Sequence, residues 1–138
     1  MSIGPEGLLR GARYIASPNC DARPRDAAIR LLVLHSISLP PGSYGGDAVE
    51  RLFTNRLDPQ AHPYFRGIAQ LRVSAHFFVR RNGALQQFVP VHRRAWHAGA
   101  SRWRALERCN DYSIGVELEG VEHGAFAAAQ YRCVARLV

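Results

Sequence analysis

Lysine is missing from the 138 residues: every one of the 18 basic residues is an arginine. This absence excludes a lysine ammonium as a catalytic group. Long apolar runs are missing too, since none approaches the roughly 20 residues that a membrane-spanning helix needs. The N-terminal stretch MSIGPEGLLRGARYI lacks the apolar centre of a secretory signal. We therefore expect a soluble, cytoplasmic protein without a membrane partner.

Cysteine is scarce, with Cys20, Cys109 and Cys133 as the three thiols. The odd number and the lack of a CxxC pair argue against a disulfide framework and against a thiolate zinc site. Several catalytic signatures are also missing. The chain has no HExxH pair, no GxSxG elbow and no glycine-rich phosphate loop, so a helical zinc site, a serine hydrolase and a nucleotide-binding fold have no support.

The formal charge of +7 favours an anionic partner, either a nucleic acid or a small molecule rich in carboxylates. The arginines are scattered, with two short pairs and no long basic run, so charge alone does not choose between these partners. The length suits one domain that buries a single core. We take residues 1–138 as that domain.

Short apolar runs with turn signals predict strands. Arg30 to His35 is such a run, followed by the loop SLPPGSYGG, and we interpret it as a buried strand. Ala75 to Val79 and Leu85 to Val89 flank Asn82 and Gly83, the strongest short-range signal for a hairpin turn.

Helical patterns lie between and after the strands. Asp47 to Asn55 has helical spacing, with Glu50 three residues after Asp47 completing the spacing of a capping box. A short helix at Gly7 to Arg13 is also expected, and Phe126 to Val138 has helical spacing with no stop signal. Ser113 to Glu119 alternates as a strand does. Together these elements predict a mixed α/β sheet with flanking helices.

Two strand positions carry groups that can do chemistry. His35 lies where its strand meets a loop, and Glu117 lies on the polar face of a later strand beside Glu119. A carboxylate aimed into a cleft can take a proton from water, whereas the plain alternative is that both glutamates coat a solvated face. A structural, hydrogen-bonded imidazole is the corresponding alternative for His35 and for His76. His97, in a loop beside a tryptophan, is better placed to contact a ligand.

Four segments resemble one family when taken together: HSISLPPGSYGG, LFTNRLDPQAHPYFRGIAQLRVSAHFFVRRNG, RAWHAGAS and ERCNDYSIGVELEG. They are similar to the zinc-dependent N-acetylmuramoyl-L-alanine amidases, of the AmpD type that acts on anhydro-muropeptides. The resemblance runs nearly without gaps from about Tyr14 to Tyr131. It implies a mixed sheet with flanking helices, as in peptidoglycan recognition proteins, and hydrolysis of the bond between the lactyl group of N-acetylmuramic acid and L-alanine.

The resemblance also implies roles for single residues. His35 matches the first zinc ligand, and Glu117 matches the carboxylate that activates the attacking water. Arg72 and Arg108 match basic residues that grip the carboxylates of the peptide, while Trp96 and His97 lie in a loop like the substrate-binding wall. The residue after the first ligand is an amide or imidazole in many relatives; here it is Ser36, a shorter donor to the substrate.

The remaining zinc ligands of the family, a histidine and an aspartate, lie with a lysine in a segment resembling GHxxIAPxRKxDPG. These 138 residues do not contain that segment. A catalytic zinc keeps three protein ligands, so we expect this chain to bind zinc weakly or not at all. It would then be either a fragment of an amidase or a truncated homologue.

Three functions stay open at this point. The first is a zinc amidase, active as a monomer in peptidoglycan recycling. The second is a non-catalytic module that binds or senses muropeptides. The third, suggested by net charge alone, is a nucleic-acid-binding domain, whose affinity for DNA would fall steeply with added salt.

Overall fold

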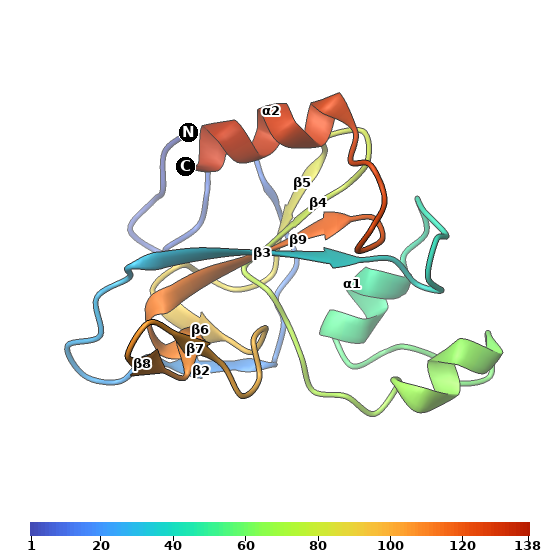
Figure 1. The fold of residues 1–138 in the computed structure, drawn as a ribbon, viewed down its shortest axis with the longest axis horizontal. Helices are drawn as coiled ribbons and strands as arrows, with labels where there is room; N and C mark the ends of the chain where they lie inside the picture. Colours follow the sequence, from blue (N-terminus) through green and yellow to red (C-terminus); the bar gives the residue numbers. More distant parts are fainter.

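A five-stranded mixed sheet forms the centre of the computed structural model, which describes all residues 1–138 (Figure 1). The strands lie in the order β1-β5-β4-β9-β3. Their bounds are Arg13–Tyr14 for β1, Leu31–Ile37 for β3, Phe77–Val79 for β4, Leu85–Gln87 for β5 and Ser113–Glu119 for β9. The predicted mixed α/β sheet is therefore confirmed.

The two longest strands, β3 and β9, are parallel neighbours and pair over seven residues. Strand β4 pairs with the other side of β9, also in parallel, so β9 is enclosed by neighbours on both sides. Strand β3 lies at the edge of the sheet. The sequence prediction of a buried strand there is wrong in this respect: its residues are only half-buried, and Leu34 is 49% exposed.

The predicted hairpin is confirmed. Strands β4 and β5 are antiparallel neighbours, with Phe78 opposite Gln86. The turn between them contains Gly83 at a φ of +84°. Asn82 accepts a hydrogen bond from the backbone N–H of Ala84 with its side-chain oxygen. A glycine suits this position because its left-handed backbone carries no steric cost.

Helix α1 (Ala48–Phe53) packs on one face of the sheet. Its apolar side chains, Val49, Leu52 and Phe53, join a core cluster with Phe78 and Phe88. The predicted helix is confirmed, but the predicted capping box is wrong, because the Asp47 side chain makes no cap hydrogen bond. That carboxylate instead pairs with Arg51 four residues on, at 2.8 Å.

Helix α2 (Ala128–Leu137) packs on the opposite face, as Figure 1 shows. Cys133 of this helix joins a second cluster with Phe77, Val116 and Leu118 from the sheet. Gln130 is fully buried, and its amide donates to the carbonyls of Val79 and Glu119. The prediction of a helix near the end of the sequence is confirmed. None of the helices is both long and apolar enough to cross a lipid bilayer.

The N-terminal segment has no helix at Gly7 to Arg13, so that prediction is wrong. Gly7 and Gly11 adopt positive φ angles of 76° and 88°, which break a helix, and the Leu9 N–H donates to the side chain of Gln87 instead of to a helical carbonyl.

Short elements connect the strands and helices of the main sheet. Two-stranded sheets pair β2 (Cys20–Ala22) with β6 (Arg93–Ala95) and β7 (Arg102–Trp103) with β8 (Leu106–Glu107). The remaining elements are two short 3-10 helices, η1 (Pro63–Gly67) and η2 (Cys109–Tyr112). Helix η2 leads directly into β9.

Candidate functional site

His35 and Glu117 are direct neighbours across the β3–β9 pair. Residues in register on adjacent parallel strands direct their side chains to the same face of a sheet. Both therefore project from the face that carries α1, where Phe78, in register with Glu117, packs against the helix. A cavity of about 1020 Å³ is lined by both residues, together with Tyr64, Leu52 and Ile37. His35 also lines a second cavity of about 570 Å³, which continues toward His97.

Glu117 is 9% exposed and lies between His35 of β3 and Phe78 of β4. Its Oε2 atom is sealed from solvent and makes no hydrogen bond. Burial raises the pKa of Glu117 to about 8, because a carboxylate loses its hydration there. This carboxyl group holds a proton near neutral pH and can exchange it, which is the property of a general acid–base group.

His35 and His97 meet ring to ring. The Nε2 atom of His35 lies 2.8 Å from Nδ1 of His97, and the ring planes are inclined by 71°. Burial lowers the pKa of His35, and burial together with the neighbouring His35 and His76 lowers the pKa of His97 to about 3. Both rings are therefore neutral at pH 7, so one donates its N–H and the other accepts.

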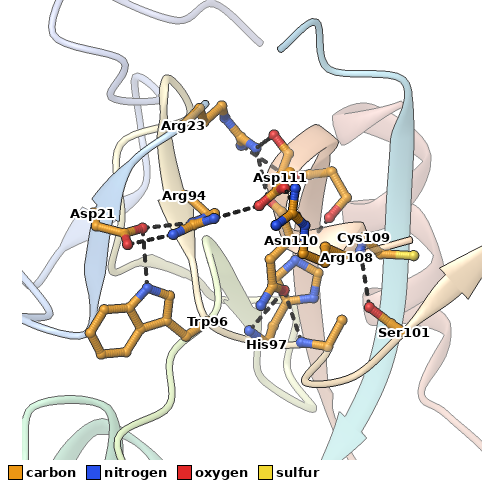
Figure 2. A network of polar contacts seen from close by, with 12 residues as sticks. Asp21, Arg23, Arg94, Trp96, His97, Ser101, Arg108, Cys109, Asn110 and Asp111 are labelled. Carbon is orange, nitrogen blue, oxygen red and sulfur yellow. Dashed lines mark hydrogen bonds and ion pairs between the residues drawn. The ribbon is translucent and has the colours of Figure 1, made fainter. Parts of the chain in front are cut away.

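The loop that carries His97 is fixed by Asn110 of η2 (Figure 2). The side-chain oxygen of Asn110 accepts from the backbone N–H groups of His97, at 3.2 Å, and Ala98, at 2.9 Å. The ring of His97 lies over Gly115 of β9, where any Cβ would overlap it. Its Nε2 lies 3.0 Å from the hydroxyl of Ser113. Sequence reasoning assigned no role to Asn110, Ser113 or Gly115, although all three belong to one of its motifs.

His76 is the structural imidazole that the sequence allowed. It is fully buried, and its Nδ1 accepts from the Gly115 N–H at 3.0 Å. The proton therefore lies on Nε2, which donates to the carbonyl of Arg93 at 2.9 Å. Burial lowers its pKa to about 4, so it stays neutral.

An arginine–aspartate network supports the same region (Figure 2). Arg94 forms a two-pronged pair with Asp21, opposite it on β2, and also reaches Asp111 of η2. The guanidinium of Arg94 lowers the pKa of Asp21. Asp21 also accepts from the indole N–H of Trp96 at 3.2 Å. The network ties β2, β6 and η2 together beside the His97 loop.

Arg23 is the second support. Its terminal nitrogens donate to four backbone carbonyls, those of Asn110, Asp111, Val91 and Ser113. These bonds join η2 and the start of β9 to the segment before β6. The sequence offered no signal for this role, because the acceptors are main-chain atoms from distant segments.

Glu119 has a structural role instead of a chemical one. It is 4% exposed, and it accepts from the backbone N–H groups of Gly45, at 2.6 Å, and Arg81, at 2.9 Å. Arg80 lies 3.6 Å from the same carboxylate. The alternative that both glutamates coat a solvated face is wrong, since Glu117 is buried as well.

The other site residues expected from the sequence do not lie beside His35 and Glu117 on the same face of the sheet. Ser36 points to the opposite face of β3 from His35, although it lines the larger cavity. Arg72 is exposed and donates to the carbonyl of Gln70. The side chain of Arg108 is 80% exposed and pairs with Asp111. Arg72, Arg108 and Trp96 line neither cavity.

These residues do not complete a zinc site. No group of three or more histidine, cysteine, aspartate or glutamate side chains is arranged to hold a metal ion. The cavity offers the imidazole of His35 and the carboxyl of Glu117, whereas a catalytic zinc needs three protein ligands and an open position.

Comparison with known families decides what this site belongs to. A model of the family described as N-acetylmuramoyl-L-alanine amidase matches residues 25–138, which include His35, His97 and Glu117. The chain belongs to the N-acetylmuramoyl-L-alanine amidase family. The resemblance inferred from the sequence is therefore confirmed.

Relatives with a known name support the same family assignment. The 1,6-anhydro-N-acetylmuramyl-L-alanine amidase AmpD of Escherichia coli K12 is 55% identical over 130 residues, which cover 94% of this chain and 71% of that protein. AmpD of Citrobacter freundii is also 55% identical, with 94% and 70% covered.

Solved structures show the same fold. A crystal structure of an AmpD selenomethionine derivative superposes with a TM-score of 0.96 at 53% identity, covering 99% of this chain and 76% of that chain. AmiD of E. coli, in complex with anhydro-N-acetylmuramic acid-L-Ala-D-γ-Glu-L-Lys, gives a TM-score of 0.50 at 29% identity, covering 83% and 44%.

Proposed function

We propose that this chain, as a single amidase domain, acts in peptidoglycan recycling by hydrolysing the amide between the lactyl group of N-acetylmuramic acid and L-alanine in anhydro-muropeptides. Two findings support the substrate: the 55% identity to an enzyme named for this amide, and the AmiD complex with an anhydro-muropeptide. The observation that carries the proposal is the register of His35 with Glu117, which directs an imidazole and a buried carboxyl to one cavity.

Glu117 supplies the acid–base chemistry in this proposal. Hydrolysis of an amide requires a proton to leave the attacking water and another to reach the departing amine. A carboxyl group with a pKa of about 8 is populated in both forms near neutral pH, so it can take the first proton and return it. The cavity walls beside the carboxyl include the apolar side chains of Leu52 and Ile37, which offer it no hydrogen-bond partner.

The outer residues would bind the substrate. Arg72 and Arg108 have exposed guanidinium groups, which suit peptide carboxylates because two parallel donors match two oxygens. Trp96 and His97 form the neighbouring loop, and Ser36 offers a hydroxyl from the lining of the larger cavity.

Zinc is the metal that the family resemblance implies, with His35 as its ligand in this chain. The fit is incomplete, because these 138 residues offer no three-ligand group. The same observation favours a second candidate function, a module that binds muropeptides without cleaving them. The nucleic-acid alternative rests on net charge alone.

One experiment separates these functions. The chain is incubated with an anhydro-muropeptide, with and without added Zn²⁺, and release of the free peptide is followed by mass spectrometry, while calorimetry measures binding. The E117Q variant is compared with E107Q, whose exposed carboxylate lies outside both cavities. Peptide release that E117Q abolishes and E107Q preserves supports the amidase. Saturable binding without release supports the binding module. The absence of both release and binding contradicts both functions.

We also propose that the chain is a monomer in the cytoplasm. Light scattering after gel filtration tests the first point, and cell fractionation tests the second. A dimer, or a signal confined to the envelope fraction, would contradict them.

A further inference from the structure

We propose that His97 is a positioning residue, which holds the His35 ring with Nε2 engaged and leaves Nδ1 as the one ring nitrogen free for a ligand. This inference rests on the proposed function in so far as His35 belongs to the site. It goes further by giving His97 a role that acts through His35, in addition to the place of its loop beside the substrate.

The first step is the fixed backbone of His97. The side-chain oxygen of Asn110 accepts hydrogen bonds from two successive backbone N–H groups, those of His97 and Ala98. A single side chain therefore holds the loop at His97. Asn110 is itself held, because its carbonyl accepts from Arg23. The loop that carries His97 is therefore hydrogen-bonded to η2, which leads directly into β9.

The second step is the position of the His97 ring over Gly115. Gly115 is the one residue of β9 without a side chain on the cavity face, and the His97 ring occupies the space that a Cβ would fill. Gly115 has no positive φ, so its backbone does not require glycine. The absence of a side chain is explained by the ring that lies on it.

The third step is the use of the ring nitrogens. His97 places Nε2 at 3.0 Å from the Ser113 hydroxyl and Nδ1 at 2.8 Å from Nε2 of His35. Neither nitrogen is left for a substrate. If His97 only filled space, the shape of its ring would be sufficient. In the structure both ring nitrogens of His97 also have hydrogen-bond partners.

The fourth step concerns protons. When His35 donates from Nε2, His97 accepts at Nδ1 and donates from Nε2 to Ser113, and Nδ1 of His35 keeps its lone pair. In the reverse arrangement Ser113 donates, His97 donates from Nδ1, and the proton of His35 lies on its own Nδ1. The hydrogen bonds of His97 thus couple the tautomer of His35 to Ser113, and they allow one proton per ring in either state.

Nuclear magnetic resonance of the ¹⁵N-histidine-labelled chain, without substrate or metal, tests the proposal. In the wild type we expect one protonated nitrogen on each ring, a slowly exchanging imidazole N–H and a coupling across the His35–His97 hydrogen bond. H97F keeps a ring over Gly115 but removes both nitrogens. We expect it to lose the coupling and to shift the ¹⁵N signals of His35, because Nε2 of His35 loses its partner.

Controls keep the test decisive. H123F makes the same substitution at an exposed histidine outside both cavities and should leave the His35 signals unchanged. H97Q can restore an acceptor and should recover part of the His35 pattern. If H97F does not fold, S113A serves instead, because losing the partner of His97 Nε2 should shift the tautomer of His35.

Two results would overturn the proposal: no His35–His97 coupling in the wild type, or His35 signals in H97F identical to those of the wild type. Because these spectra involve no muropeptide, they are independent of the proposed function. A His35 ring that is hydrogen-bonded to His97, in a chain that neither binds nor cleaves muropeptides, would refute the function and leave the positioning role standing.

Discussion

Replacing Glu117 with glutamine should remove a pH dependence that the buried carboxyl imposes on stability. Burial raises the pKa of Glu117 from 4.5 to about 8, so between these values the folded chain holds a proton that the unfolded chain has released. The stabilisation from this proton is fully present below the lower pKa and is lost as the pH rises through the higher one. Each pH unit in that window costs about 1.4 kcal/mol.

The expected change in stability is large relative to the total free energy of unfolding of a domain. Between about pH 5.5 and 8 the Glu117 contribution falls by about 3 kcal/mol, whereas a domain is stable by roughly 5–15 kcal/mol. The buried histidines act in the opposite direction at lower pH. The pKa of His76 is lowered to about 4 and that of His97 to about 3, so their effect is to destabilise the fold as the pH falls below 6.5.

The difference between the wild type and E117Q isolates Glu117, since the histidines are present in both proteins. Urea unfolding at a series of pH values gives the free energy of unfolding of each, with E107Q as the control. We expect E117Q to gain stability relative to the wild type by about 3 kcal/mol from about pH 5.5 to 8. A difference that stays constant across this range would refute the assignment of a buried, protonated carboxyl.

Three further predictions concern packing. G115A should force the His97 ring off β9 and cost about 1–3 kcal/mol, whereas G67A, at a site with open space, should have little effect in the same urea assay. Q130L should cost about 2–4 kcal/mol, because it leaves two buried carbonyls under α2 without their donor; thermal unfolding measures this, and an unchanged midpoint would contradict it. F53A should cost about 3–5 kcal/mol by opening a cavity beside Phe88, and a loss below 1 kcal/mol would show that the core closes around it.

Local patterns predicted much of the sheet. The alternation from Ser113 to Glu119 identified β9 and placed Glu117 on its polar face, and Asn82 with Gly83 identified the hairpin. The position of β3 at the edge could not be predicted, because an apolar run has the same period in an edge strand and in a central one. The capping box at Asp47 failed since a nearby cation competed for the carboxylate.

The candidate site was predictable only in part. His35 and Glu117 came from strand positions and from the family resemblance, and the register of β3 with β9 places them together. The contact between His35 and His97 joins residues 62 apart in the sequence, so no local pattern indicates it. The support from Arg23 was equally hidden, because it depends on backbone carbonyls whose positions only the fold determines.

The most direct test of the central claim is to map where an anhydro-muropeptide binds on the ¹⁵N-labelled chain. Both the amidase and the binding module require the ligand to lie in the cavity shared by His35 and Glu117. We expect saturable shifts concentrated on the C-terminal half of β3, on β9 around Glu117 and on the residues near Tyr64. Shifts confined to the outer surface of α2, around Arg132 and Arg136, or no saturable shift at all, would contradict the claim.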